Sequence, residues 1–271
     1  MKPLLFKAYF GFLTEPFSKE IATKALFLSE QLKALFERLQ HFITRRGIAL
    51  VTGEVGSGKS TALRAFTESL DKNHHAIVYI DDPTLGLRGM FNSMARQLNL
   101  NAQFFKWQLV PELKAAIEKT FADYHKTTLL IIDDAQHLKP QALDELRLLT
   151  NFRIDSQAPL SLVLLAQPEF RKVVQLKTLE AFRQRLTLRI HLTGLAQSEA
   201  AGYVKHQLEI AGRTDTLFTD DVIAEIYQQA KGIPRLLNTL CYECLLDIYR
   251  QQKNVVDMPT LEKVLCQYDN W

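Results

Sequence analysis

Residues 48–61, IALVTGEVGSGKST, decide the fold of this chain. The apolar run 48–52 has the composition of a buried strand, and residues 61–70, TALRAFTESL, favour a helix. Between them lies a full match to the P-loop pattern G-x-x-x-x-G-K-[ST]. Glycines allow a tight turn whose backbone N–H groups converge on phosphate oxygens at the start of the helix. A glycine-rich turn without a ligand is the alternative, but the flanking strand and helix favour a nucleotide site.

Each position of this segment has a chemical role in such a site. Lys59 is placed to reach the β- and γ-phosphates, and the Ser60 hydroxyl is placed to ligate Mg²⁺. The sequence therefore predicts ATP and Mg²⁺ as cofactors. The predicted nucleotide contacts are Gly53, Glu54, Val55, Gly56, Ser57, Gly58, Lys59, Ser60 and Thr61.

The composition is that of an ordinary globular protein. The 271 residues are 47% hydrophobic and 23% charged, enough for one sizeable core and a smaller one. The net charge of +3 permits nucleic acid binding without requiring it. No apolar run reaches the length of a membrane helix, and the N-terminus lacks the features of a signal peptide. We expect a soluble, cytoplasmic protein without a membrane segment.

Apolar strands alternate with helices over most of the chain. Continuous apolar strands in such an alternation indicate a parallel sheet covered by helices on both faces. The predicted strands are 48–52, 76–82, 129–132, a run within 159–166, and 188–192. From about Leu195 onward only helices are predicted, at 197–211, 219–230, 234–251 and 258–265. The fold class is therefore α/β with a five-stranded parallel sheet, followed by a small helical lid.

The predicted domains are 1–195 and 196–271. Residues 1–24 are predicted to be a loop-rich entry to the first domain, and they carry Tyr9, Phe10, Phe12 and Phe17. Two interpretations stay open for this apolar segment: it packs near the adenine of the nucleotide, or it is a strap over the core.

Two carboxylates end the predicted strand Leu129–Ile132. Ligands of parallel sheets bind beyond the carboxyl ends of the strands, so Asp133 is placed to hold Mg²⁺ in the manner of a Walker B aspartate. Asp134 is placed to orient and deprotonate the attacking water. The alternative, that the two acids cap the next helix, is disfavoured by the P-loop.

Several further polar positions are candidates. Gln167 follows the strand within 159–166, where it would sense the γ-phosphate or water unless it is only a turn amide. Arg183, Arg185 and Arg189 lie in residues 169–191, a segment with six Lys or Arg and two acids. One of these arginines would complete the site of a neighbouring subunit, or the segment is a solvated face. Arg235, in the first turn of a lid helix, would reach the nucleotide.

Taken together, GEVGSGKS, LLIIDDAQHL, LLAQPEF, FRQRL and GIPR resemble, in this order and spacing, an AAA+ ATPase. The segments YFGFLTEPFSKEI, NFRIDSQAPLSLVLLAQPEF and GIPRLLNTLC more narrowly resemble the ExeA/GspA-type ATPases. That group includes secretion ATPases and short ATPases carried beside transposases, similar in role to TnsC, MuB and IstB. The resemblance implies that Gln167 is sensor 1, Arg235 sensor 2, and Arg185, in preference to Arg183, the arginine finger.

The chain departs from the family pattern in two ways. Many relatives have Asp-Glu where this chain has Asp133-Asp134, and the shorter side chain implies slow hydrolysis or signalling by ATP binding itself. Secretion members of the group carry a membrane helix and a cell-wall-binding region after the ATPase. This sequence ends at Trp271 without them, which favours the transposition form.

The resemblance implies a homo-oligomeric ring or filament around duplex DNA. Arg88 and Lys106 are predicted to contact DNA phosphates without regard to sequence. The expected function is an ATP-dependent, DNA-binding regulator of transposition that recruits a transposase and a target-selection protein. The alternatives are an ATPase of a secretion or envelope assembly system, and an ATP-gated scaffold with little hydrolysis.

Overall fold

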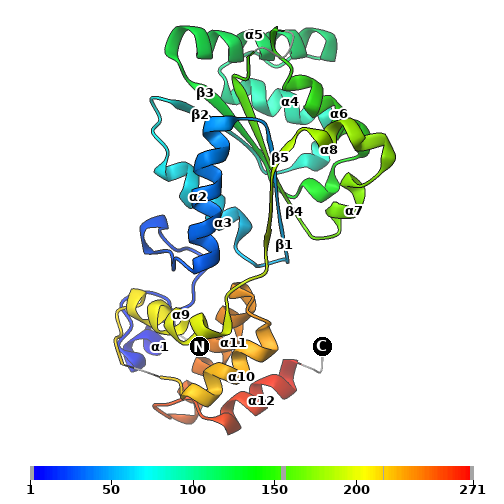
Figure 1. The fold of residues 1–271 in the computed structure, drawn as a ribbon. Coiled ribbons are helices and arrows are strands. Elements are labelled where there is room, and N and C mark those ends of the chain that lie inside the picture. Colours follow the sequence, from blue (N-terminus) through cyan, green and yellow to red (C-terminus); the bar gives the residue numbers. More distant parts are fainter. Residues whose placement is uncertain (1–2, 154–156, 216, 269–271) are drawn as a thin grey trace. The chain divides into compact units, whose positions relative to one another are not determined.

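A computed structural model describes residues 3–153, 157–215 and 217–268, and its chain divides into two compact units (Figure 1). The α/β unit comprises residues 32–55 and 59–192. The helical unit comprises residues up to Gln31, the short segment Gly56–Gly58, and the chain from Thr193 onward. Residues 1–24, which the sequence places with the α/β domain, are thus grouped with the helices.

The described part of the α/β unit contains one parallel sheet with the strand order β2-β3-β4-β1-β5, which confirms the predicted α/β fold. All six residues of β1, all six of β3 and all seven of β4 are buried, because these strands lie inside the sheet and helices cover both faces. The strands are β1 (Ile48–Gly53), β2 (His75–Ile80), β3 (Thr127–Ile132), β4 (Leu160–Ala166) and β5 (Leu186–Leu192).

Two apolar layers cover the sheet. On one face Leu35, Leu39 and Phe66 of α2 and α3 pack against Val51 and Val163 of the strands. The other face is covered by the remaining helices of this unit through a larger cluster. The helices around the sheet are α2 (Glu30–Arg45), α3 (Lys59–Ser69), α4 (Gly86–Gln97), α5 (Lys106–Tyr124), α6 (Pro140–Leu149), α7 (Phe170–Val174) and α8 (Glu180–Gln184).

The helical unit has its own apolar core, which includes the N-terminal segment. Residues 3–10 form a helix, where the sequence predicts a loop, because Phe6 and Phe10 lie one helical turn apart and are both buried. Phe6 also contacts Tyr249, with ring centroids 5.6 Å apart. The helices are α1 (Pro3–Phe10), α9 (Gln197–Ile210), α10 (Asp220–Ala230), α11 (Pro234–Gln251) and α12 (Met258–Tyr268).

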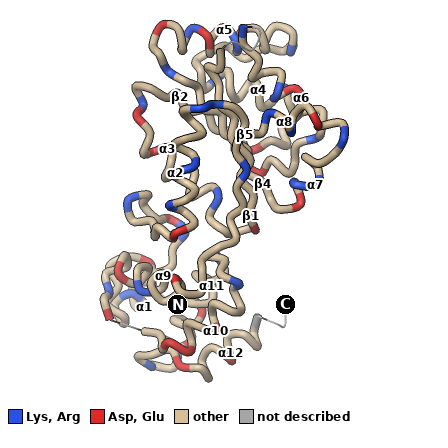
Figure 2. Tube along the Cα trace, viewed as in Figure 1, with Lys and Arg blue, Asp and Glu red and all other residues tan. Residues whose placement is uncertain are grey.

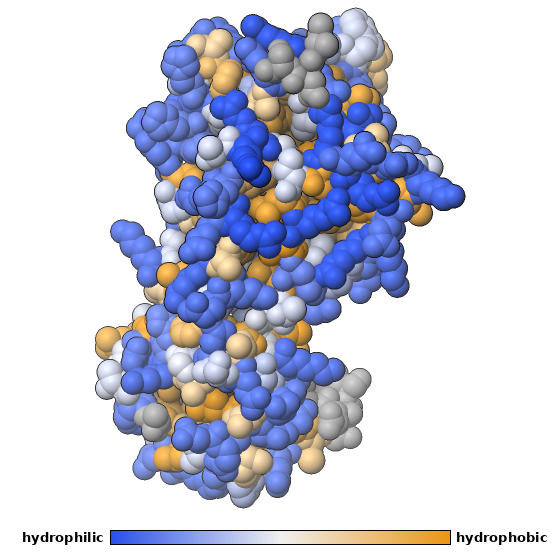
Figure 3. Space-filling model, viewed as in Figure 1, coloured by the Kyte–Doolittle hydropathy of each residue, from blue (hydrophilic) through white to orange (hydrophobic). Residues whose placement is uncertain are grey.

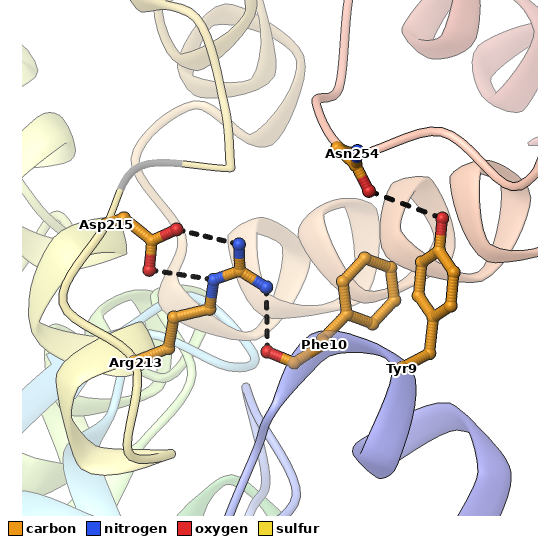
Figure 4. A network of polar contacts seen from close by, with 5 residues as sticks. All are labelled: Tyr9, Phe10, Arg213, Asp215 and Asn254. Carbon is orange, nitrogen blue, oxygen red and sulfur yellow. Dashed lines mark hydrogen bonds and ion pairs between the residues drawn. The ribbon is translucent and has the colours of Figure 1, made fainter.

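Polar contacts also hold α1 in the helical unit (Figure 4). Arg213 donates from Nη1 to the backbone oxygen of Phe10 over 2.7 Å, while its Nε and Nη2 bind the carboxylate of Asp215. Tyr9 donates its hydroxyl to the backbone oxygen of Lys253 over 3.1 Å and also contacts Asn254. Of the two interpretations of the aromatic segment, these contacts support a strap over the core of the helical unit.

We expect Phe6→Ala to lower the free energy of unfolding of the helical unit by about 3–5 kcal/mol, because it removes a buried ring and leaves a cavity. Leu5→Ala is the matched control on the same helix, since Leu5 is 57% exposed. Urea unfolding of both variants, followed by circular dichroism, measures the difference. Equal stability of the two variants would contradict this placement of α1.

Candidate nucleotide site

The sheet order brings the main predicted site residues to one edge. Because β4 lies between β3 and β1, the carboxyl ends of these three strands are adjacent. Thr52 is paired with Ala166, so the next residues of the two strands, Gly53 and Gln167, lie at the same level of the sheet. Asp133 follows β3 directly. The α/β unit therefore assembles the start of the P-loop, Asp133 and Gln167 at one place.

The P-loop has the backbone that its glycines predict. Gly56 and Gly58 have φ values of 85° and 92°, in the left-handed region that disfavours residues with a Cβ. The Lys59 ammonium is buried and donates to the backbone oxygens of Gly53 and Glu54 over 2.7 and 2.9 Å. Within the described chain, Ser57 Oγ is buried and makes no hydrogen bond. A loop with an inward-held lysine and an unsatisfied hydroxyl fits the phosphates of a nucleotide.

Asp133 is a buried carboxylate whose two oxygens are both hydrogen-bonded. Its Oδ1 accepts from the backbone N–H of Asp134 over 2.8 Å, and its Oδ2 accepts from the Tyr79 hydroxyl over 2.8 Å. Each carboxylate oxygen still has a second lone pair for a metal or a metal-bound water. With Ser60 at the start of α3, Asp133 fits a magnesium ion that takes its remaining ligands from phosphate and water.

Tyr79 is a site residue that the sequence analysis does not identify. It lies on β2 and is paired with Ile131 of β3, two residues before Asp133. The Gln97 side chain accepts from the backbone N–H of Tyr79 over 2.9 Å and donates to its backbone oxygen over 2.8 Å. Partial burial and the bond to Asp133 raise the pKa of Tyr79 well above its usual value, so its hydroxyl stays a donor. Its role is to orient the Asp133 carboxylate.

Asp134 has a backbone that few non-glycine residues adopt. Its φ and ψ are 47° and 39°, in the left-handed region that short polar side chains such as Asp tolerate best. The Oδ1 atom accepts from Gln136 Nε2 over 2.9 Å. Neither predicted acid caps the following short helix, Ala135–His137, with its side chain, because Asp134 has no cap hydrogen bond and Asp133 accepts from the Asp134 N–H.

Gln136 joins the ends of β3 and β4, and it too is missed by the sequence analysis. Its Nε2 donates to Asp134, while its Oε1 accepts from the backbone N–H of Gln167 over 3.1 Å. One amide side chain thus holds the predicted base and the predicted sensor 1 residue in a fixed relation. Nothing in the local pattern distinguishes Gln136 from a surface glutamine, because its second partner is 31 residues away.

The arginine candidates lie elsewhere. Arg185 directly precedes Leu186, which pairs with Ile48 at the opposite end of β1 from the P-loop. Five residues of strand separate these two levels, about 16 Å at roughly 3.3 Å per residue. The α/β unit therefore does not bring Arg185 to its own P-loop. Arg235 is exposed in the first turn of α11, in the helical unit, and its role as sensor 2 stays a prediction.

The structure places the two predicted DNA contacts near a group of exposed aromatic side chains. Arg88 stacks over the Phe104 ring, with its Cζ 4.7 Å from the ring centroid. Phe104 and Trp107 are 69% and 71% exposed. Lys106, by contrast, forms an ion pair with Glu145, which neutralises its charge. Arg88 is therefore the better placed of the two for a phosphate.

The fold and the site together define a P-loop protein that binds a nucleotide. The family model described as AAA domain matches residues 31–174, more than half of the chain. The chain therefore belongs to the AAA-domain family, and it is an AAA+ ATPase. Among the described residues, none of the helices combines the length and the apolarity needed to span a membrane.

Among curated proteins, the chain is similar to the general secretion pathway protein A of Aeromonas hydrophila. The two are 30% identical over 253 residues, which cover 89% of this chain and 44% of the relative. The chain thus spans less than half the length of that protein.

Solved structures share the fold at low identity. Cdc6p of Pyrobaculum aerophilum has a TM-score of 0.66 at 18% identity, covering 89% of this chain and 67% of that one. The ORC2 protein of Aeropyrum pernix, in ADPNP-ADP complexes, has a TM-score of 0.68 at 13% identity, with coverages of 91% and 70%. The ORC1 protein of the same organism, in complex with DNA, has a TM-score of 0.62 at 16% identity, with coverages of 89% and 66%.

We expect Tyr79→Phe to raise the Mg²⁺ concentration needed for half-maximal ATP hydrolysis about tenfold, because partners that orient a metal ligand typically contribute 10- to 100-fold to affinity. Tyr124→Phe is the control, since Tyr124 is 65% exposed. A magnesium titration of both variants at saturating ATP measures the effect. An unchanged titration for Tyr79→Phe would remove this role from the residue.

We expect Gln136→Leu to lower kcat for ATP hydrolysis about tenfold while nucleotide affinity stays within twofold of the wild type, because Asp134 loses its hydrogen bond donor and proton transfer depends on geometry. Gln141→Leu, at an exposed position of α6, is the matched control. Steady-state hydrolysis together with binding of a fluorescent ADP separates the two effects. A parallel loss of affinity would indicate a general disturbance of the site.

Proposed function

We propose that this AAA+ ATPase binds ATP with Mg²⁺ at the P-loop and at the end of β3, and hydrolyses it. Lys59 and the loop N–H groups hold the phosphates, while Ser60 and Asp133 hold the metal ion. When bound, Mg²⁺ neutralises the charge that develops on the transferred phosphoryl group. Asp134 accepts the proton of the attacking water, and Gln167 senses the γ-phosphate. The bonds of Asp133 and Gln136 are the observations that support these assignments.

Hydrolysis by this site is slow in our proposal. Asp134 has one methylene less than the Glu of many relatives, and Gln136 holds its carboxylate in place. A base with a short reach depends strongly on the position of the water. The long-lived ATP state then serves as the signal, and hydrolysis ends it.

The nucleotide state controls assembly of a homo-oligomer. Support comes from Arg185, which lies at the end of the sheet away from its own P-loop and would act as an arginine finger for a neighbouring copy. Arg235 acts as the sensor 2 residue. Loss of the nucleotide then weakens two things: the arrangement of the site residues, and the contact between neighbouring copies.

The oligomer forms on duplex DNA and regulates transposition by recruiting a transposase and a target-selection protein. The observation that carries this proposal is the surface of Arg88, Phe104, Phe105 and Trp107, where a cation and exposed rings lie together. Contacts of Arg88 with phosphates would be independent of sequence and sensitive to salt. The resemblance of the sequence to short ATPases carried beside transposases supports the same function.

A second candidate is a role in a secretion or envelope assembly system. It is favoured by the similarity to the general secretion pathway protein A of Aeromonas hydrophila. In that role the ATPase would act through a membrane partner rather than through DNA.

Gel shifts of a duplex at low salt distinguish the two candidates. We expect retarded complexes with ATP and with a non-hydrolysable analogue, and longer-lived complexes for Asp134→Asn with ATP because that variant keeps binding but loses the base. Lys59→Ala should lose nucleotide binding and assembly together, since its ammonium is the cation of the P-loop.

Absence of any shift with either nucleotide would overturn the DNA-binding function. Co-fractionation of the protein with a membrane complex, in the absence of DNA affinity, would favour the secretion candidate. Normal ATP affinity in Lys59→Ala would contradict the site assignment itself.

A further inference from the structure

A pocket of about 280 Å³ lies in the α/β unit, and it begins beside the P-loop because Thr52, the residue before Gly53, lines it. It follows β1 and β5 on the face of the sheet that α7 and α8 cover. From Leu186 to His191 the lining strand rises about 16 Å at roughly 3.3 Å per residue, so the pocket is elongated. Its lining residues are Leu50, Thr52, Arg171, Val174, Gln175, Arg183, Leu186, Arg189, Ile190 and His191.

Three arginines converge on this pocket, and none of its lining residues is acidic. Figure 2 shows Lys and Arg positions along β5 and around α7 and α8. In the part of the chain that the structure describes, no carboxylate forms an ion pair with Arg171, Arg183 or Arg189. Like charges brought together without a counter-charge repel each other. Such an arrangement attracts an anion.

The arginines are held by neutral groups, which leaves their charge uncompensated. Arg171 donates from Nε to Thr52 Oγ1 over 3.1 Å, and Arg189 donates from Nη2 to the backbone oxygen of Arg183 over 3.0 Å. Burial and the nearby Arg171 charge lower the pKa of His191, so this ring is neutral at pH 7. The pocket is therefore positive through its guanidinium groups, and two of them are already oriented.

The floor of the pocket is apolar. A basic surface that only contacts water would need no such floor. Leu50, Val174 and Leu186 contribute side chains from both strands and from α7, and all three belong to the apolar cluster on this face. Figure 3 shows apolar residues in the upper part of the view, partly covered by strongly hydrophilic ones. A ligand that satisfies the whole pocket needs an acidic group for the arginines and an apolar part for the floor.

We propose that this pocket binds an amphiphilic anion, a carboxylate or phosphate group attached to an apolar body. The acidic group pairs with Arg171, Arg183 and Arg189, and the apolar body lies against Leu50, Val174 and Leu186. Two kinds of ligand combine these groups: a free organic acid, and a peptide segment with acidic and apolar side chains. None of the lining residues is a predicted phosphate or metal ligand, and the proposal does not rest on the proposed function.

Calorimetric titrations with phenyl phosphate test the proposal, with inorganic phosphate as the probe that lacks the apolar body. We expect phenyl phosphate to bind one site per chain, at least tenfold more tightly than inorganic phosphate. Arg171→Gln and Arg189→Gln should each weaken binding tenfold or more. Lys172→Gln, a neighbouring exposed position outside the lining, should change it less than twofold.

Two further experiments determine where the ligand binds and which kind of ligand it is. Phenyl phosphate binding is also measured with Lys59→Ala and with wild-type protein saturated with ADP. Binding that persists in both samples is binding to the pocket. Binding that is lost in both is binding to the P-loop, which would overturn the proposal. A peptide of alternating Glu and Leu, compared with its Gln and Leu counterpart, tests the polypeptide source. Circular dichroism verifies that each variant is folded. Absence of saturable binding by both phenyl phosphate and the acidic peptide, or binding equal in the arginine variants and the wild type, would also overturn the proposal.

Discussion

The site depends on the two hydrogen bonds that hold the Asp133 carboxylate at the end of β3. A carboxylate that is 8% exposed loses most of its hydration, and this loss costs free energy unless donors replace the water. One donor is the backbone N–H of the next residue, Asp134. The other is Tyr79, which arrives only because β2 is paired with β3 in one register.

The same sheet order connects this carboxylate to the rest of the site. From β2 to β4 the polar contacts run from Tyr79 to Asp133, on through Asp134, and then through Gln136 to the backbone of Gln167. These hydrogen bonds tie the ends of the three strands to one another. This is a physical route by which occupancy of the phosphate site would be felt along the whole edge of the sheet.

The sequence alone predicts the parts of the molecule that local pattern determines. The P-loop turn, the five strands, the helix after the P-loop and the four helices from Gln197 onward follow from glycine spacing and from apolar runs. The helix at Pro3–Phe10 is missed because its stability comes from packing on Tyr249, 239 residues beyond Phe10, rather than from a long periodic pattern. Tyr79 and Gln136 are missed for a related reason: their partners lie on other strands, and single-sequence periodicity carries no information about register. The ion pair of Lys106 with Glu145 likewise joins distant positions.

The Gln97 side chain limits the pairing of strand β2 with a strand of another molecule. β2 is an edge strand, and its outward N–H and C=O groups at Tyr79 are those to which a strand of another molecule would bond. The Gln97 amide occupies both groups, as a neighbouring strand would. The edge is therefore closed at the residue that orients the metal ligand, and sheet-to-sheet pairing cannot begin there without first displacing this side chain. One glutamine thus closes this part of the sheet edge and fixes the backbone of the residue that donates to Asp133.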